Sequence, residues 1–282
     1  MSGRASSAEH GSLAARRRLR RRRAFIAWGV FLCAILGAAV YGIWREPVRI
    51  SRIVVYGTDQ SLSSVVTPAL RGAYFGVIPR DSAFFLPEND IRARILAARP
   101  DISAVAVFRD GLTGLSIRVD RRVPIARWCG APPAAWTGPG AASSTAATTA
   151  AEDCYLFDAQ GFVYAHATTS EEAAVNPFAV YETAATSSQA IGTTLPRSDR
   201  FPLAFDFARQ LSVFGSPVSA VVFRGDEADD YLASGTRITY VLGREQDALA
   251  ALTSARANLN LADGSIGYAD LRFPGKMYVK KK

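Results

Sequence analysis

The chain has 282 residues, which is enough for about two domains, and its formal net charge is +8. Residues 1–23 carry eight Arg and one Glu, so the charge of the remaining chain is close to balanced. Because nucleic-acid binding requires a basic surface on the folded domain, this distribution argues against a nucleic-acid partner and indicates a membrane-topology signal instead.

An apolar segment follows the basic tail. Seven of the eight residues at 16–23 are Arg, and residues 24–44 carry no charge. As a helix such a segment spans roughly 32 Å, close to the ~30 Å hydrocarbon core of a bilayer, and we predict a transmembrane helix. Because positive residues beside a span stay in the cytoplasm, residues 1–23 are expected to be cytoplasmic and residues 45–282 extracytoplasmic.

A cleaved signal peptide is the alternative interpretation of this segment. The small residues at 37–39 could serve as a cleavage site. The apolar run is longer than the roughly 7–15 residues of a typical signal-peptide core, so we expect an uncleaved anchor. Residues 1–15 are rich in Ser, Gly and Ala without apolar periodicity, and we predict that they are disordered.

Residues 48–128 show strand and helix patterns in the order β-α-α-β-β. A β-branched run at 48–56 indicates the first strand. An amphipathic helix is expected near residues 62–70, with Ser61 as its candidate cap. Pro68 conflicts with this, so that the helix either kinks or begins later with Thr67 as its cap.

A second helix and two strands complete this region. Asn89 is predicted to cap the helix, and the Arg-Pro pair at 99–100 ends it. A strand is predicted at 102–108, with a turn at 110–111. Apolar and polar residues then alternate over 115–119, which indicates a strand with one buried face.

This order resembles a POTRA domain, a polypeptide-transport-associated module. The run IVVYG at 53–57 is similar to the module's opening strand and glycine, and the Arg-Pro pair at 99–100 resembles its helix–Pro–strand step. The run VPIARW at 123–128 resembles its closing R-x-P-[VI]-A-x-W pattern. A single POTRA domain behind an anchor with an Arg-rich tail resembles the FtsQ/DivIB family of bacterial cell-division proteins. Outer-membrane assembly proteins also carry POTRA domains, usually in series and without such an anchor.

Residues 130–153 separate the POTRA-like region from a second region. Of these 24 residues, 21 are Ala, Gly, Pro, Ser or Thr, a composition typical of a flexible loop. Cys129 and Cys154 flank the loop, and outside the cytoplasm a disulfide between them would tie its base. Cys33 lies within the apolar span, where we interpret it as a small apolar residue.

Residues 154–279 are predicted to form a second α+β domain with a mostly antiparallel sheet. A hairpin is expected at 155–164, and strands at Val218–Arg224, at 236–242 and at roughly 266–279. Two helices are expected between them. Asp199 would cap the first, which ends at Gly215 and whose apolar face comprises Leu203, Phe207, Leu211 and Phe214. The apolar face of the second comprises Ala248, Leu252, Ala255 and Leu259.

Two stretches of this region extend the family resemblance. The hairpin at 155–164 resembles the D-x-x-G-x-[VF] hairpin that opens the second extracytoplasmic domain of FtsQ. DLRF at 270–273 and KMYV at 276–279 resemble the D-L-R-[FY]…K-V-x-V ending of the family. The resemblance covers about residues 16–279, and the cysteine-flanked loop departs from it.

The sequence contains no recognisable catalytic, metal-binding or cofactor-binding pattern. There are two histidines, His10 in the tail and His166, which we interpret as a surface residue. No zinc-ligand spacing, nucleophile turn or glycine-rich phosphate loop occurs. The acidic run at 225–230 lacks the full calcium-loop pattern, and we interpret it as a solvated loop. We therefore expect no enzyme activity, cofactor, metal or small-molecule substrate.

The family resemblance implies a non-enzymatic scaffold that links early and late proteins of the division machinery at the division site. It implies that the POTRA domain contributes to recruitment and that the C-terminal part pairs with the small bitopic coiled-coil proteins FtsB and FtsL. One alternative is a POTRA-bearing factor for protein translocation or envelope assembly. Another is an envelope enzyme such as a wall hydrolase.

The terminal strand is the predicted partner site, because the resemblance points to it. A strand at a sheet edge has unpaired backbone groups to which a partner strand can add. The predicted partner-binding residues are Asp270, Arg272, Phe273, Lys276, Met277 and Tyr278. Lys276 and the Lys run at 280–282 either protect the edge against association or select an acidic partner strand.

Overall fold

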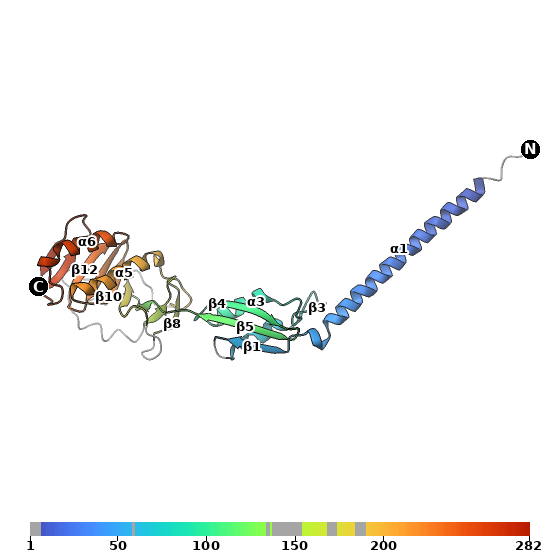
Figure 1. Ribbon diagram of the computed structural model, residues 1–282, viewed down its shortest axis with the longest axis horizontal. Coiled ribbons are helices and arrows are strands. Elements are labelled where there is room, and N and C mark those ends of the chain that lie inside the picture. Colours follow the sequence, from blue (N-terminus) through green and yellow to red (C-terminus); the bar gives the residue numbers. More distant parts are fainter. Residues whose placement is uncertain (1–6, 58–59, 134–135, 137–153, 168–173, 184–189) are drawn as a thin grey trace, which may run out of the picture. The chain divides into compact units, whose positions relative to one another are not determined.

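The chain is an α+β protein with one apolar helix near its N-terminus and mostly antiparallel sheets (Figure 1). The computed structural model describes residues 7–57, 60–133, 136, 154–167, 174–183 and 190–282. The chain divides into two compact units. The first comprises Met1–Arg99 with Ala104–Asp120, and the second comprises Pro100–Ser103 with Arg121–Lys282.

The N-terminal helix α1 spans Ser7–Ile43. Its segment Leu19–Ile43 is long and apolar enough to cross a membrane, which agrees with the predicted span. The helix begins well before the span, so the predicted disorder of residues 1–15 is wrong for the part from Ser7 onward, and residues 1–6 lie outside the described residues. Ala, Leu, Glu and Arg favour helix, and extending a formed helix costs far less than nucleating a new one.

The first unit is built on a three-stranded sheet of order β1-β5-β4, in which β1 runs parallel to β5. Its elements after α1 are η1 (Glu46–Val48), β1 (Arg52–Tyr56), α2 (Leu62–Val66), η2 (Thr67–Leu70), β2 (Ala73–Tyr74), β3 (Ile78–Pro79), α3 (Glu88–Ala98), β4 (Ile102–Asp110) and β5 (Gly114–Arg121). The predicted order β-α-α-β-β is present, with the small hairpin β2–β3 inserted between the helices. The core includes Leu62, Val66, Ile91, Ile95 and Ile117.

Two prolines explain where the first unit departs from the sequence-based expectation. The first strand begins at Arg52 rather than at residue 48, because the preceding Pro47 lies in the short 3-10 helix η1. Pro68 neither delays the next helix nor kinks an α-helix. The chain instead changes from α-helix to 3-10 helix at Thr67, where backbone hydrogen bonds join residues three rather than four positions apart.

Ser61 occupies the N-cap position of α2 as predicted, without a side-chain cap hydrogen bond, but the predicted caps of the two longer helices are wrong. Asn89 lies inside the first turn of α3, which begins one residue earlier at Glu88. Asp199 lies within the 3-10 turn η6 (Ser198–Arg200) that precedes α5 (Phe201–Leu211). Neither α-helix has a side-chain cap. Each instead begins beside a proline, whose fixed backbone φ suits the start of a helix.

The second unit is built on a nine-stranded sheet of order β14-β13-β12-β11-β10-β9-β6-β7-β8. Its strands are β6 (Ala126–Trp128), β7 (Tyr155–Phe157), β8 (Val163–His166), β9 (Ala179–Glu182), β10 (Val218–Arg224), β11 (Glu227–Leu232), β12 (Arg237–Val241), β13 (Ile266–Asp270) and β14 (Tyr278–Lys281). Its further helices are η7 (Ser212–Phe214), α6 (Glu245–Ala255) and η8 (Arg256–Asn258).

The boundary between the units differs from the one expected at residue 128. Strand β6 pairs antiparallel with β7 and parallel with β9, so the VPIARW run contributes a strand to the second unit. The stretch 130–153 therefore connects two neighbouring strands of one sheet rather than two domains. Its residues 134–135 and 137–153, on which the expected flexibility bears, lie outside the described residues.

The core of the second unit lies between the sheet and the helices α5 and α6. Helix α5 contributes several buried aromatic rings, among which Phe201 and Phe205 stack at 5.3 Å between centroids. Phe207 and Leu211 are buried as predicted, but Leu203 is 48% exposed. The apolar face is rotated away from Leu203, and its members are Phe201, Ala204, Phe205, Phe207, Ala208 and Leu211.

Two further expectations for the second unit are wrong. The acidic run at 225–230 is not a solvated loop, because from Glu227 it forms β11 in the interior of the sheet, where Asp229 and Asp230 are buried. Residues 266–279 are not one strand but a hairpin of β13 and β14, which the Pro-Gly turn at 274–275 separates. The predicted strand at Val218–Arg224 is β10 with the same bounds.

Candidate interaction site at the C-terminal sheet edge

Strand β14 forms one edge of the nine-stranded sheet. Among the strands of the described residues it pairs only with β13, with Tyr278 opposite Asp270 and Val279 opposite Ala269. All residues of β14 are exposed. Such a strand carries backbone donors and acceptors that no neighbouring strand pairs, which makes it a template for strand addition.

The hydrogen-bond alternation identifies which backbone groups face outward. The Lys282 N–H donates to the Ser265 carbonyl at 3.0 Å, so residue 282 faces inward. In an antiparallel strand successive residues alternate between the two sides of the ladder. The N–H and C=O groups of Val279 and Lys281 therefore face away from β13, where a partner strand would pair with them.

Apolar side chains accompany this edge. Phe273 is 49% exposed, Tyr278 54% and Val279 40%. The rings of Phe273 and Tyr278 meet edge to face at 5.5 Å between centroids. Lys276 is exposed, whereas Met277 is half-buried and packs against the core. Of the predicted partner-binding residues, Phe273, Lys276 and Tyr278 are thus on the accessible surface.

The other two predicted residues, Asp270 and Arg272, are engaged inside the unit. The Arg272 guanidinium donates to both carboxyl oxygens of Asp270, at 3.0 and 2.7 Å, and to Glu227 of β11 at 3.1 Å. Burial alone would raise the pKa of the Asp270 carboxyl, but the hydrogen bonds from Arg272 outweigh it and lower this pKa below its usual value. The pair fixes the connection between β13 and β14 and thereby positions the edge.

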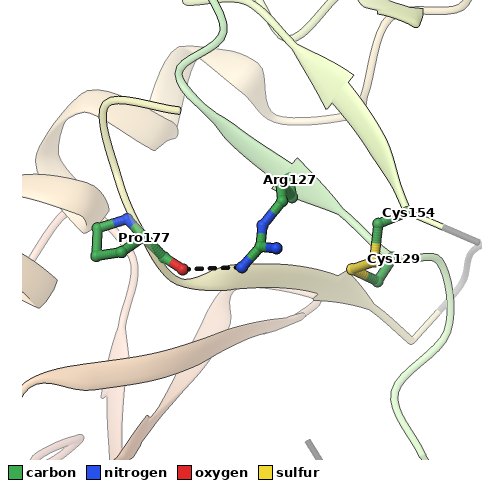
Figure 2. The surroundings of a disulfide bond; sticks show 4 residues. All are labelled: Arg127, Cys129, Cys154 and Pro177. Atoms are coloured by element: carbon green, nitrogen blue, oxygen red, sulfur yellow. Dashed lines mark hydrogen bonds between the residues drawn. A yellow bond between two sulfur atoms is a disulfide. The ribbon is translucent and has the colours of Figure 1, made fainter. Parts of the chain in front are cut away.

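A disulfide joins Cys129 to Cys154 in the structure, with their Cα atoms 4.2 Å apart (Figure 2). It links the end of β6 to the start of β7. The adjoining backbone is held by a hydrogen bond from the Cys129 N–H to the Val180 carbonyl at 2.8 Å. Arg127 donates to the Pro177 carbonyl at 3.1 Å. The base of the 130–153 stretch is thus fastened to the sheet by both covalent and hydrogen bonds.

Trp136 is a packing residue that the sequence reasoning missed. Its ring stacks on Tyr231 at 4.6 Å and meets Tyr181 edge to face at 5.3 Å. The Tyr231 hydroxyl donates to the Trp136 carbonyl at 3.0 Å, and Trp136 is only 6% exposed. A signal was available, since this is the single aromatic residue in a stretch of small residues.

A buried acidic group in β11 was also missed. Asp229 accepts hydrogen bonds from Arg224, at 2.8 Å, and from the Thr239 hydroxyl. The carboxyl group of the neighbouring Asp230 forms no hydrogen bond of regular geometry among the described residues, and the Tyr240 hydroxyl is the group that interacts with it. Burial, reinforced by the charges of Asp229 and Glu245, raises the pKa of Asp230 well above its usual value.

Within the described part of the chain, no three His, Cys, Asp or Glu residues gather as a metal site. His166 is exposed, and its ring contacts that of Tyr155 at 4.6 Å. Asp230 has no exposed surface, so a substrate cannot reach it in this structure. The arrangement with the clearest chemical capacity is the β14 edge, which can form backbone hydrogen bonds with an extended peptide.

No protein-family model matches the chain, and no curated protein matches it in sequence. Function is therefore inferred from the chain's own residues and their geometry.

Proposed function

We propose that this protein is a non-enzymatic, single-pass membrane scaffold of the FtsQ/DivIB type, which binds small bitopic division proteins such as FtsB and FtsL. Helix α1 anchors it in the cytoplasmic membrane, with the Arg-rich tail in the cytoplasm and both folded units outside. The order β1-α2-α3-β4-β5 supports a POTRA-like role for the first unit, which contributes to recruitment to the division site.

One observation carries the proposed binding mode, namely the exposed β14 edge beside the Phe273–Tyr278 ring pair. A partner segment adds to the sheet as a further strand and pairs with the outward groups of Val279 and Lys281. Backbone hydrogen bonds give affinity in this mode, and contacts with the rings give selectivity. Lys276 and the Lys run at 280–282 favour an acidic partner and speed its association.

A POTRA-bearing factor for protein translocation or envelope assembly is the second candidate. The β-α-α-β-β order of the first unit favours it equally. The two candidates differ in location, since a division scaffold concentrates at midcell and an envelope-assembly factor is distributed around the cell. Imaging of the tagged full chain in dividing cells separates them.

The first prediction concerns the edge itself. Proline at position 279 removes an outward N–H and leaves the inward ladder of β14 intact, so the unit should fold while partner binding falls sharply. Val279→Ala is the matched control, because it trims the side chain and keeps the N–H. Binding is measured by recovery of FtsB- and FtsL-type proteins with the tagged full chain from solubilised membranes. Equal recovery with Val279→Pro and Val279→Ala, in folded protein, would rule out strand addition at β14.

A further inference from the structure

The first unit carries an unusual hairpin tip next to the end of the apolar helix. Strands β2 and β3 pair through Ala73–Pro79 and Tyr74–Ile78, and the Val77 N–H donates to the Tyr74 carbonyl at 3.0 Å. The two residues of the tip, Phe75 and Gly76, both have positive φ, 51° and 71°. This left-handed pair is the conformation that two-residue hairpins normally fill with Asn, Asp or Gly.

Phe75 is therefore conformationally unfavourable at this position. A bulky side chain is strained at positive φ, and here the side chain is also 100% exposed, so packing within the protein does not compensate for the strain. A residue with a strained backbone whose side chain packs against no other part of the protein is a candidate for a functional role. A fully exposed aromatic ring at a tight tip is suited to entering an apolar phase.

The tip is tied to the end of the predicted span. Trp44 immediately follows α1, and its indole Nε1–H donates to the Val77 carbonyl at 2.7 Å. Tryptophan at the end of a membrane helix lies at the headgroup level. A hydrogen bond from that ring places the Val77 backbone at the same level, two residues from Phe75.

Other exposed apolar residues of this unit lie on segments that are hydrogen-bonded to residues 44–51, the linker between α1 and β1. The Ala83 N–H donates to the Val48 carbonyl at 2.9 Å, and the Thr113 carbonyl accepts from Ser51 at 2.9 Å. The exposed apolar residues on these segments are Trp44, Phe75, Val77, Phe84, Phe85 and Leu112. Cationic groups accompany them, since the Arg80 guanidinium covers the Tyr74 ring at 4.9 Å. Aromatic rings flanked by Arg are typical of surfaces that lie in the membrane interface.

We propose that the β2–β3 hairpin is a membrane-contact site, in which Phe75 inserts into the interface of the bilayer that α1 spans. The ligand is the lipid surface itself. The contact fixes the first unit against the membrane through a second point besides the covalent linker. It rests on the membrane anchor of the proposed function, and it is independent of partner binding at β14.

The test measures the depth of a fluorescent probe in the full chain, reconstituted into vesicles of phosphatidylethanolamine and phosphatidylglycerol. An environment-sensitive dye is attached to Phe75→Cys in a Cys33→Ser background, and spin-labelled lipids act as quenchers. Tyr56→Cys is the matched control, because Tyr56 is an exposed aromatic residue at the far end of β1. Wild-type protein labelled at Cys33 reports on the span.

We expect quenching by shallow spin labels and a blue-shifted emission at position 75, no change at position 56, and quenching by deep labels at position 33. Emission at position 75 that matches position 56 would overturn the proposal and leave the anchor standing. If position 33 is also unquenched, the anchor and the hairpin contact both fall. The β14 binding assay is unaffected in each case, so the two proposals fail separately.

A second arm asks whether the Phe75 ring makes the contact. The probe is placed at Val77→Cys, which keeps the backbone carbonyl that Trp44 binds. Phe75→Asn fits the left-handed backbone without an apolar ring, and it should abolish quenching at position 77. Phe75→Leu restores an apolar side chain and should retain the quenching. Equal quenching in both variants would show that the ring does not insert, and adsorption of the probe alone would produce this result.

Discussion

At the scale of single residues, Asp230 is the most consequential group that composition and periodicity could not reveal. Its sequence context, two aspartates after Glu227 and Ala228, is typical of a solvated turn, yet Asp230 is completely buried. Its charged form is disfavoured by burial and by the nearby carboxyl groups of Asp229 and Glu245, so its pKa is raised. At a pH between the ordinary pKa of an aspartate and the raised pKa of Asp230, the folded protein keeps this carboxyl protonated, whereas the unfolded chain has lost the proton.

The sign of the pH dependence follows from this proton. Above about pH 4, where an unfolded aspartate ionises, the folded state binds more protons than the unfolded state. The free energy of unfolding therefore decreases as pH rises from there toward the raised pKa of Asp230, by up to about 1.4 kcal/mol per pH unit.

Replacing Asp230 by Asn should remove this dependence. Relative to wild type, Asp230→Asn is expected to gain stability steadily as pH increases above about 4, because the amide cannot ionise. The measurement is urea unfolding of the second unit at a series of pH values. Asp226→Asn is the control for the loss of one acidic group, since Asp226 is exposed on the turn that precedes β11. Parallel profiles for Asp230→Asn and wild type would contradict the assignment.

Residue identity alone did not reveal the ion pairs that two of the predicted partner-binding residues form. Asp270 and Arg272 of the DLRF run pair with each other, and Arg272 also pairs with Glu227. Which side of a strand a charge lies on depends on register, and a bulge near residue 267 sets that register. Phe273 and Tyr278 are exposed as expected, and in the described sheet Tyr278 lies on the edge strand β14.

At the scale of elements, the C-terminal hairpin of β13 and β14 carries two features with different roles. The Arg272–Asp270 ion pair stabilises the fold, and the exposed ring of Phe273 is available to a partner. Arg272→Met leaves the buried Asp270 carboxylate without its cation, whereas Glu227 keeps its ion pair with Arg224, and the loss should cost about 1–2 kcal/mol once solvent screening of the partly exposed Arg is included. Because the pKa of Asp270 is lowered in the folded state, this stabilisation is present at neutral pH. It is lost as pH falls below about 4, so the variant and wild type converge in acid.

Phe273→Ala is the matched comparison for Arg272→Met. Its ring is half exposed and contacts mainly Tyr278, so its removal should leave the unfolding free energy nearly unchanged while weakening partner recovery. Urea unfolding and co-purification from membranes are measured on both variants. A loss of stability with Phe273→Ala as large as that with Arg272→Met would show that the ring is a core residue rather than a contact.

The pattern of apolar residues correctly predicted the elements in which this pattern is the strongest sequence signal. Strand β10 was correct because it is a nearly continuous apolar run that is buried on both faces, and the alternation at 115–119 was correct because one face of that strand is buried. Strand β11 was missed because its ionisable residues are typical of a solvated loop, although its two partners, β10 and β12, are its neighbours in sequence. The helix starts were displaced by one or two residues, since proline rather than a capping side chain fixes them.

At the scale of the whole molecule, the position of β6 determines how the chain can be divided. The sequence suggested that residues 130–153 separate two domains, but β6 precedes this stretch and lies inside the second unit's sheet. The first 129 residues thus contribute an internal strand to the C-terminal unit. In the loop-entropy model, the disulfide that closes the stretch, with a sequence separation of 25, stabilises this arrangement by roughly 3.5 kcal/mol.

Cutting the chain within residues 130–153 tests the two kinds of bond that hold the flanking segments together, namely the disulfide and the hydrogen bonds of β6. A site-specific protease sequence inserted after Thr145 allows one defined cut in the purified full chain. On a denaturing gel the two fragments should remain joined without reductant and separate with it, because only the Cys129–Cys154 disulfide then connects them. Under native conditions they should stay together even after reduction, since β6 keeps its hydrogen bonds to β7 and β9 and Trp128 stays buried in the core. Gel filtration of the cut, reduced protein gives the answer: separate elution of the fragments would mean that the domain boundary lies at the loop and that β6 is not part of the second sheet.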